Sequence, residues 1–307
     1  MSKTILITHP DCLNHVMERH PERPERLTAV LNRLEASGVK EEMNQVLASE
    51  ITQAQLQLAH PEKYIKSIFE SEPTGKVIKV DPDTYMSEGS SRAAKLAAGA
   101  VAEATTRVLK GESRRAFCAV RPPGHHAEVA EAFGFCLFNN IAIAACIALQ
   151  NSTIKRVAIL DFDVHHCNGT VDIFKDDPRV LVCSSFQENL FPNRYLDFNN
   201  EHILNTPFAE GTKGTHFRGR IESEWLGKIQ SHKPDLIFVS AGFDAHKDDP
   251  LAGLSLVEDD YHWITSMIVD LANTYTEGRI ISVLEGGYNL ESLSNSTLAH
   301  VEALISN

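Results

Sequence analysis

Short hydrophobic runs alternate along the chain with longer segments of helical composition. Several of the short runs are continuously apolar, which is typical of parallel strands covered on both faces. The expected strands span residues 4–8, 116–120, 157–161, 180–184, 236–240 and 279–284. The expected helices span residues 23–37, 61–71, 87–110, 139–151, 216–231, 258–276 and 290–305. This alternation predicts a three-layer α/β/α fold with a mainly parallel sheet, formed by a single domain over residues 1–307.

Composition narrows the class of protein. The 307 residues are 43% hydrophobic and 23% charged, which excludes a disordered, collagen-like or disulfide-framework chain. The net charge of −12 argues against direct binding of nucleic acid through its phosphates. The six cysteines are scattered and form no CxxC pair, which is typical of a reducing compartment. The sequence shows no signal peptide and no apolar run long enough for a bilayer. We therefore expect a cytoplasmic protein without membrane association. Whether the chain forms a homo-oligomer is left open by the sequence.

Four of the expected strands end in loops rich in glycine, histidine and aspartate. These loops read RPPGHHA (121–127), DVHHCNG (163–169), AGFDA (241–245) and EGGYN (285–289). The carboxyl ends of parallel strands meet at one rim of a sheet, where ligands bind in folds of this kind. We therefore expect the four loops to converge on one site.

Asp163, His165 and Asp244 are the candidate ligands of a zinc ion. Alternation along an extended segment puts the first two side chains on the same side, and Asp244 arrives from another strand end. Three protein ligands with an open position are typical of a catalytic zinc site. His166 and Cys167 follow where a two-metal site would need another carboxylate, so we expect one metal ion. An isolated Asp-x-His could instead cap a loop, and only the convergence of loops favours the metal.

The adjacent His125 and His126 lie on a loop stiffened by prolines, with Asp161 and Asn168 as suitable partners. A carboxylate favours a charged imidazole more than an amide does, so one histidine suits a proton-accepting role and the other an electrostatic one. The alternatives are a surface pair that scavenges metal or a packed loop. Tyr288 is either an oxyanion donor or a packed core aromatic.

Six motifs occur in order: HPERPERL (20–27), RPPGHHA (121–127), FGFCLFNN (133–140), LDFDVHHCNGT (160–170), SAGFDAHKDDPLAG (240–253) and LEGGYNL (284–290). Together they resemble the zinc-dependent histone deacetylase family, most of all its class II branch and the bacterial deacetylase-like amidohydrolases. The resemblance implies an arginase/deacetylase-type fold with one zinc ion at the bottom of a narrow acyl-lysine tunnel.

The resemblance also implies roles for individual residues. The zinc ligands are again Asp163, His165 and Asp244. The catalytic set is His125 with Asp161 as the electrostatic pair, His126 as general base and acid, Tyr288 as oxyanion donor, and Asn168, a class II trait. The substrate-binding set is Asp83 at the rim, Gly134, Phe135 and Phe191 in the wall, Leu251 at the mouth, Gly287, and Arg26 near the acetate exit.

The family also binds potassium, which implies two further sites. The inner site comprises Asp161, Asp163, His165, Ser184 and Ser185. The outer site comprises Phe174, Asp177, Val180 and His202.

This chain departs from the class II pattern at two places. Phe186 stands where relatives usually have histidine, and FPNRYLDFNN (191–200) replaces a loop that usually reads FPGTG. The hypothesis is a zinc-dependent deacetylase that hydrolyses an N-acyl amide of lysine in proteins to acetate and a free amine. An acetylpolyamine or small-molecule amidohydrolase is the alternative. A non-catalytic acyl-lysine-binding module would be expected to have lost a ligand, a histidine of the pair or Tyr288, and none is missing.

Overall fold

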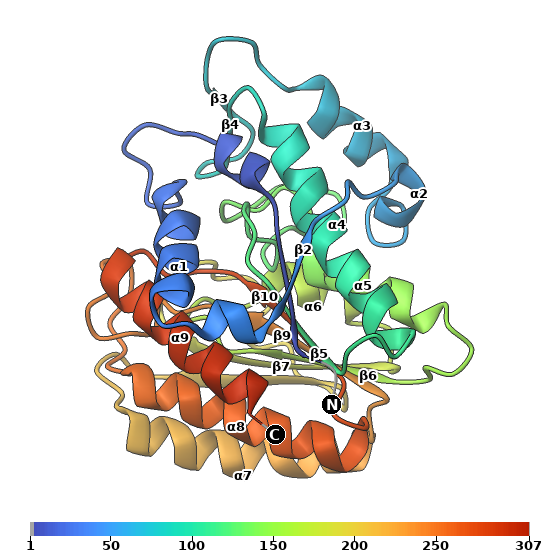
Figure 1. Cartoon of the computed structure of the whole chain (residues 1–307), viewed down its shortest axis with the longest axis vertical. Helices are drawn as coiled ribbons and strands as arrows, with labels where there is room; N and C mark the ends of the chain where they lie inside the picture. The colour runs from blue at the N-terminus through green and yellow to red at the C-terminus, as the bar shows by residue number, and fades with distance from the viewer. Residues whose placement is uncertain (1–2, 307) are drawn as a thin grey trace.

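A computed structural model describes residues 3–306. Its centre is an eight-stranded sheet of order β2-β1-β5-β10-β9-β6-β7-β8, in which all paired strands run parallel (Figure 1). The strands are β1 (Ile5–Thr8), β2 (Asn44–Leu47), β5 (Arg115–Cys118), β6 (Val157–Asp161), β7 (Val180–Gln187), β8 (Ile203–Phe208), β9 (Leu236–Ala241) and β10 (Ile280–Leu284). A separate antiparallel pair joins β3 (Ile78–Lys79) to β4 (Tyr85–Met86).

Helices cover both faces of this sheet, which confirms the expected α/β architecture. They are α1 (Glu25–Ala36), α2 (Gln53–Leu56), α3 (Glu62–Glu70), α4 (Ser90–Leu109), α5 (Asn140–Leu149), α6 (Asn168–Phe174), α7 (Gly214–His232), α8 (Glu258–Tyr275) and α9 (Leu290–Ile305). Short 3-10 helices span Pro10–Asn14 and Val39–Glu42. Helices α7, α8 and α9 form one layer, to which α1 adds by packing on α9, and α4 with α5 covers the other face (Figure 1).

All six strands expected from the sequence are present, and the sheet has two more at its edges. β2 carries the sequence NQVL, of which no residue is fully buried, and β8 contains Asn205 and Pro207. β2 therefore leaves a weak apolar pattern, whereas β8 is buried at four of its six positions but its apolar run is interrupted by Asn205, Thr206 and Pro207. β7 also extends to Gln187, because Val182–Gln187 pairs with β8.

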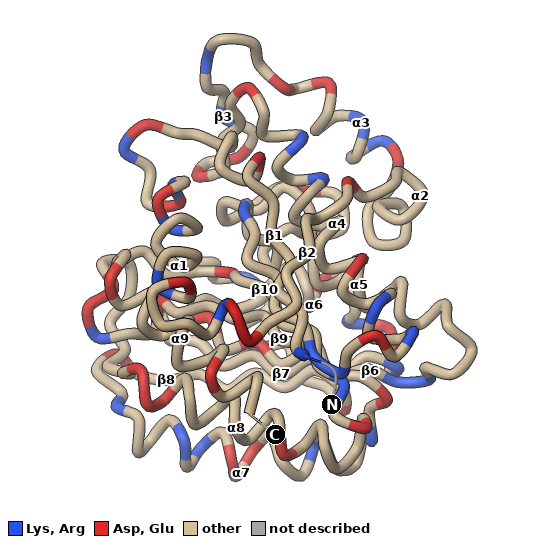
Figure 2. Tube along the Cα trace, viewed as in Figure 1, with Lys and Arg blue, Asp and Glu red and all other residues tan. Residues whose placement is uncertain are grey.

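The strands bury an almost uncharged core. Val157–Asp161 and Ile280–Leu284 are buried at every position, as expected for strands covered on both faces. Figure 2 shows the strands almost entirely in the colour of uncharged residues, with Asp and Glu mixed among Lys and Arg on the helices and loops around them. Within residues 3–306, no helix combines the length and hydropathy needed to cross a membrane.

Candidate active site

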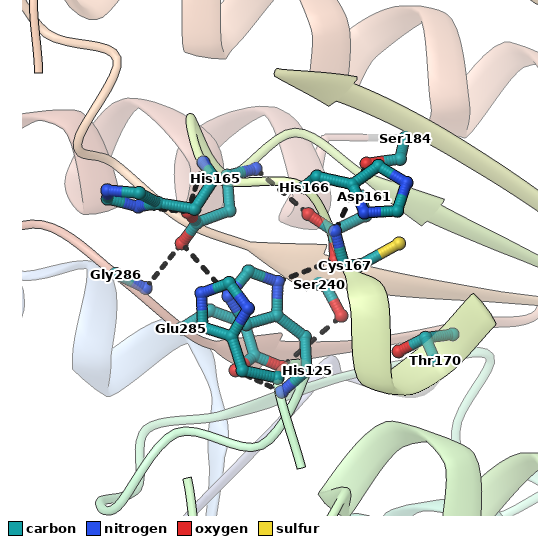
Figure 3. A network of polar contacts seen from close by, with 12 residues as sticks. His125, Asp161, His165, His166, Cys167, Thr170, Ser184, Ser240, Glu285 and Gly286 are labelled. Atoms are coloured by element: carbon teal, nitrogen blue, oxygen red, sulfur yellow. Dashed lines mark hydrogen bonds and ion pairs between the residues drawn. The ribbon is translucent and has the colours of Figure 1, made fainter. Parts of the chain in front are cut away.

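The four polar loops converge at the carboxyl edge of the sheet, as the parallel strand order requires. RPPGHHA follows β5, DVHHCNG follows β6, and the loops with Asp244 and Tyr288 follow β9 and β10. These strands are neighbours in the order β5-β10-β9-β6. Figure 3 shows His125 from the first loop, His165 from the second and Gly286 from the last around a common centre.

Asp163, His165 and Asp244 form one buried group whose potential ligand atoms all lie within 4.8 Å of one another. The Nδ1 atom of His165 is 3.1 Å from Asp163 Oδ1 and 3.1 Å from Asp244 Oδ2. Backbone amides orient both carboxylates. Gly286 N donates to Asp163 Oδ2 over 2.8 Å, and Val164 N donates to Asp244 Oδ1 over 2.8 Å. The group is therefore held in place by the fold.

Two glycines leave the space that these carboxylates occupy. A Cβ atom on Gly242 would lie 2.0 Å from Asp163 Oδ2, and one on Gly286 would lie 2.1 Å from Asp244 Oδ2. Two buried carboxylates directed at one imidazole nitrogen need a compensating cation. One histidine and two carboxylates are also a donor set that a catalytic divalent metal accepts. The three residues therefore fit a bound metal ion.

His166 and Asp248 are two further ligand-type residues close to this group in the sequence, and neither joins it. His166 Nε2 lies 2.9 Å from Asn205 Oδ1, and the Asp248 side chain is 58% exposed. Phe186, which stands where class II relatives usually have histidine, is buried and packs edge-on against His166 at 4.9 Å between ring centroids. The departure at Phe186 therefore lies next to His166, the residue that follows His165 of the metal-type group (Asp163, His165 and Asp244).

The two adjacent histidines are buried and have different partners. His125 Nδ1 lies 2.9 Å from Asp161 Oδ2, and His126 Nδ1 lies 2.7 Å from Asn168 Oδ1. Each acceptor oxygen requires an N–H at Nδ1, so both rings direct Nε2 away from their partner. The ring centroids of the two histidines are 3.9 Å apart.

The electrostatic surroundings separate the two histidines. Burial opposes the charged form of His125, but the carboxylates of Asp161 and Asp163 outweigh it and raise its pKa to about 10. Burial, followed by the charges of His125 and His165, holds the pKa of His126 well below its ordinary value. One charged and one neutral imidazole therefore lie side by side, which is the difference in protonation state expected from their two partners.

Tyr288 lies at the outer edge of the same site. Its backbone amide donates to Asp249 Oδ2 over 2.7 Å, and its ring is 5.9 Å from the Phe135 ring in an edge-on arrangement. The guanidinium carbon of Arg26 is 4.9 Å from the centroid of the Tyr288 ring. Tyr288 and Leu251 line the same open surface pocket. The tyrosine is therefore at a pocket wall, half-buried, and not within the hydrophobic core.

Phe191 and Gly134 both contact His126. The Phe191 ring stands edge-on to the imidazole at 5.1 Å, and a Cβ on Gly134 would lie 2.4 Å from His126 Cδ2. Gly134 also has a positive φ of 54°, which favours glycine. Its backbone amide donates to Asp83 Oδ1 over 3.2 Å. Phe191 and Gly134, which were assigned to the tunnel wall, thus contact His126 of the histidine dyad (His125 and His126). Asp83, which was assigned to the rim, is bonded to Gly134.

Arg26 is buried beneath the last loop. Its Nε donates to the Gly287 carbonyl and its Nη2 to the Glu285 carbonyl, each over 2.5 Å. Glu22 lies between Arg26 and Arg121, with oxygen–nitrogen distances of 3.0 and 2.5 Å. The two guanidinium groups outweigh burial and lower the pKa of Glu22 to about 2. The sequence suggested neither Glu22 nor Arg121.

Both residue sets assigned to potassium are clustered. In the inner set, Ser184 pairs with Asp161 across neighbouring strands, and Ser185 Oγ donates to the Asp161 carbonyl over 3.4 Å. Asp163 and His165 follow directly along the chain.

In the outer set, His202 Nε2 donates to the Phe174 carbonyl over 3.2 Å. Val180 N donates to the Asp177 carbonyl over 3.1 Å. Asp177 N donates to the Phe174 carbonyl over 2.9 Å, so the members of the outer set are connected through two backbone oxygens.

Sequence reasoning missed two glutamates that support the histidines. Glu285 is fully buried, and its carboxylate accepts hydrogen bonds from Gly124 N at 2.7 Å and His125 N at 3.2 Å. Glu128 accepts from the Asn168 side-chain amide at 2.7 Å. Glu285 follows a buried strand in the motif LEGGYNL, and that position was the available signal. No local pattern around Glu128 indicates its partner.

This chain is similar to known proteins over most of its length. The histone deacetylase domain matches residues 20–304. Histone deacetylase 15 of Arabidopsis thaliana is 36% identical over 93% of this chain and 53% of its own length. Type-2 histone deacetylase 2 of Dictyostelium discoideum is 35% identical over 99% of this chain and 21% of its own length. The chain thus spans between a fifth and about half of these two relatives.

A relative of similar length and a solved structure complete the comparison. An uncharacterized protein of Synechocystis sp. is 35% identical over 93% of this chain and 94% of its own length. The crystal structure of the HDA15 HD domain superimposes with a TM-score of 0.92 at 34% identity, covering 99% of this chain and 88% of that domain. The chain described here belongs to the histone deacetylase family.

Proposed function

We propose that this chain is a zinc-dependent deacetylase that hydrolyses the N-acyl amide of lysine side chains in proteins. One observation carries the proposal. The metal-type group of Asp163, His165 and Asp244 lies beside two buried histidines, His125 bound to the Asp161 carboxylate and His126 bound to the Asn168 amide. Membership of the histone deacetylase family supports a hydrolase. The acyl-lysine substrate and the zinc ion are part of the proposal.

Asp163, His165 and Asp244 would hold the zinc ion. A zinc ion bound there would supply Lewis-acid polarisation and lower the pKa of a water molecule. The protein's own contribution starts with Gly286 N, which fixes the Asp163 carboxylate. The acidic shell of Asp161, Asp163 and Asp244 also makes the site favourable for a cation.

His126 would be the general base and acid. Its Nδ1–H is held by Asn168, so Nε2 is free to take a proton from water and return it to the leaving nitrogen. The low pKa of His126 keeps this nitrogen unprotonated at neutral pH. His125, kept charged by Asp161, would stabilise the negative charge that develops on the acyl group.

The Tyr288 hydroxyl would donate a hydrogen bond to the oxyanion. Water then adds to the acyl carbon, the carbon–nitrogen bond breaks, and acetate and a free amine are released. Phe135, Phe191 and Gly134 would enclose the acyl-lysine stem, with Asp83, Leu251 and Gly287 at the outer end and Arg26 on the acetate side.

We also propose that the single domain of residues 1–307 binds structural potassium at its two oxygen-rich sets.

The substrate decides between this proposal and its nearest alternative, an acetylpolyamine or small-molecule amidohydrolase. The net charge of −12 suits any cationic product and favours neither. Leu251 lies where an acidic residue often occurs in relatives that select polyamines. We therefore favour acylated lysine.

The test is a panel of acetyl-lysine peptides, trifluoroacetyl-lysine and acetylated polyamines, with acetate or trifluoroacetate release measured in the presence of zinc. The proposal predicts turnover of the lysine substrates with the higher kcat/KM. Preferred turnover of polyamines would support the alternative. Turnover of no acylated amine would contradict both and favour a non-catalytic acyl-lysine-binding module.

A further inference from the structure

The loop of residues 191–200, which departs from the usual family sequence, is tied to the site through Arg194. The guanidinium group binds Glu131 with two bonds, from Nη1 to Oε2 at 2.9 Å and from Nη2 to Oε1 at 3.2 Å. Its Nη1 also lies 3.0 Å from Glu128 Oε2. The paired carboxylates raise the pKa of Arg194. Arg194 therefore connects the loop to Glu128 and Glu131 as a charged, partly exposed side chain.

Arg194 is also the outermost member of a stack that reaches the dyad. Its guanidinium carbon is 4.1 Å from the centroid of the Phe133 ring. Phe133 stacks on Phe191 at 4.9 Å with 19° between the ring planes, and Phe191 stands edge-on to His126 at 5.1 Å. A planar guanidinium packs on an aromatic face as well as forming two parallel bonds to a carboxylate. The side chain thus holds Phe133, and through it Phe191, from the outside.

Arg194 is connected to the dyad by a second route. Glu128 binds Arg194 through Oε2 and accepts from Asn168 Nδ2 through Oε1 at 2.7 Å. Asn168 in turn holds His126. The Arg194 charge faces two carboxylates, so it is neutralised and offers little attraction to an acidic substrate. Its geometry points to positioning and not to direct substrate binding.

We propose that Arg194 is a positioning residue that keeps the tunnel narrow around the lysine stem by fixing Phe191 beside His126. The inference rests on the proposed deacetylase function. Without the Arg194 stack, Phe133 and Phe191 can move away from His126, and space for a wider lysine stem opens there. Discrimination by one methylene in an apolar pocket is worth about 10-fold or more, so this effect is measurable.

The experiment compares kcat/KM for peptides that carry acetyl-lysine, or acetyl-lysine with one added methyl group on its side-chain stem, in the wild type, Arg194→Ala and Arg194→Lys. Arg220→Ala is the matched control, because Arg220 also binds a glutamate, Glu224, and lies 5.1 Å from a phenylalanine ring, Phe208, away from the dyad. Thermal unfolding is measured for every variant.

Arg194→Ala is expected to raise the ratio of kcat/KM for the methyl-branched substrate to that for the unbranched substrate about 10-fold or more. Arg194→Lys keeps the charge but loses the planar fork, so it should shift the ratio in the same direction. Arg220→Ala should leave the ratio unchanged. An Arg194→Ala ratio within twofold of the wild type overturns the inference, even if its melting temperature falls. Absence of turnover in the wild type would instead overturn the proposed function.

Discussion

Asn168 connects His126 to Glu128. Its Oδ1 accepts from His126 Nδ1 at 2.7 Å, and its Nδ2 donates to Glu128 Oε1 at 2.7 Å and to the His126 carbonyl at 3.2 Å. The amide can satisfy these partners because it has both an acceptor and a donor end. A carboxylate has only acceptors. The residue that holds the imidazole is therefore matched to the glutamate behind it.

Asn168→Asp should destabilise the protein. The donor Nδ2 of Asn168 would be replaced by a carboxylate oxygen, which cannot donate to Glu128 or to the His126 carbonyl. We expect a loss of about 1–3 kcal/mol in the free energy of unfolding. Adding Glu128→Gln provides an amide donor and should recover much of this loss, with Glu128→Gln alone as the control. Chemical denaturation measures the four proteins. Strictly additive effects of the two substitutions would contradict the pairing.

Tyr288→Phe should act on rate and not on folding. Loss of one oxyanion donor is expected to lower kcat on the order of 10²-fold or more. The ring contacts with Arg26 and Phe135 remain, so metal content and melting temperature should stay near the wild type. Tyr275→Phe, a half-buried tyrosine on α8, is the matched control. A kcat close to that of the wild type would remove Tyr288 from the mechanism.

His60 should make stability depend on pH. Its Nδ1–H donates to the Val129 carbonyl at 3.0 Å and its Nε2 accepts from Asn139 N at 2.9 Å, so the neutral ring is required. Burial, only partly opposed by the Val129 carbonyl, lowers its pKa from 6.5 to about 4. As pH falls from about 6.5 to about 4, the unfolded chain therefore binds a proton that the folded chain does not.

The consequence is measured as the change in unfolding free energy from pH 7 to pH 5, in the wild type and in His60→Gln. Glutamine offers one donor and one acceptor but does not titrate. The wild type should lose about 2 kcal/mol more than the variant over this range. Equal losses in the two proteins would show that His60 titrates alike when folded and unfolded.

Asp244→Ala should lose bound metal and activity together, because Asp244 comes from a separate strand end and His166 is engaged by Asn205. Asp163→Ala should lower the melting temperature more, because Asp163 also accepts from Gly286 N and His165 N. Metal content by mass spectrometry and thermal unfolding test both, with the exposed Asp248→Ala as control. A full equivalent of zinc in Asp244→Ala would refute this ligand set.

Much of the site was predictable, because its residues directly follow buried strands. Asp163, His165 and Asp244 could be assigned from position alone, since the carboxyl ends of parallel strands meet. The edge strand β2 was missed because it buries too little apolar surface to leave a pattern. β8 was missed because polar residues and a proline interrupt its buried apolar positions.

The supporting contacts lie beyond local sequence patterns. Glu128 meets Asn168, 40 residues away, and Arg194 meets Glu131 across 63 residues. Such pairs depend on how two loops are placed by the sheet and not on spacing along the chain. The pKa of His125 is lowered by burial and raised by the carboxylates of Asp161 and Asp163, and its direction can be predicted only when the positions of these residues are known.

The most direct test of the central claim is acetate release from an acetyl-lysine peptide with the bound metal counted in the same sample. The purified chain is stripped with a chelator, assayed, reloaded with zinc and assayed again. The account predicts that activity disappears on stripping and returns in proportion to zinc, up to one equivalent per chain. Full activity in a sample that retains less than about a tenth of an equivalent of any metal would contradict it.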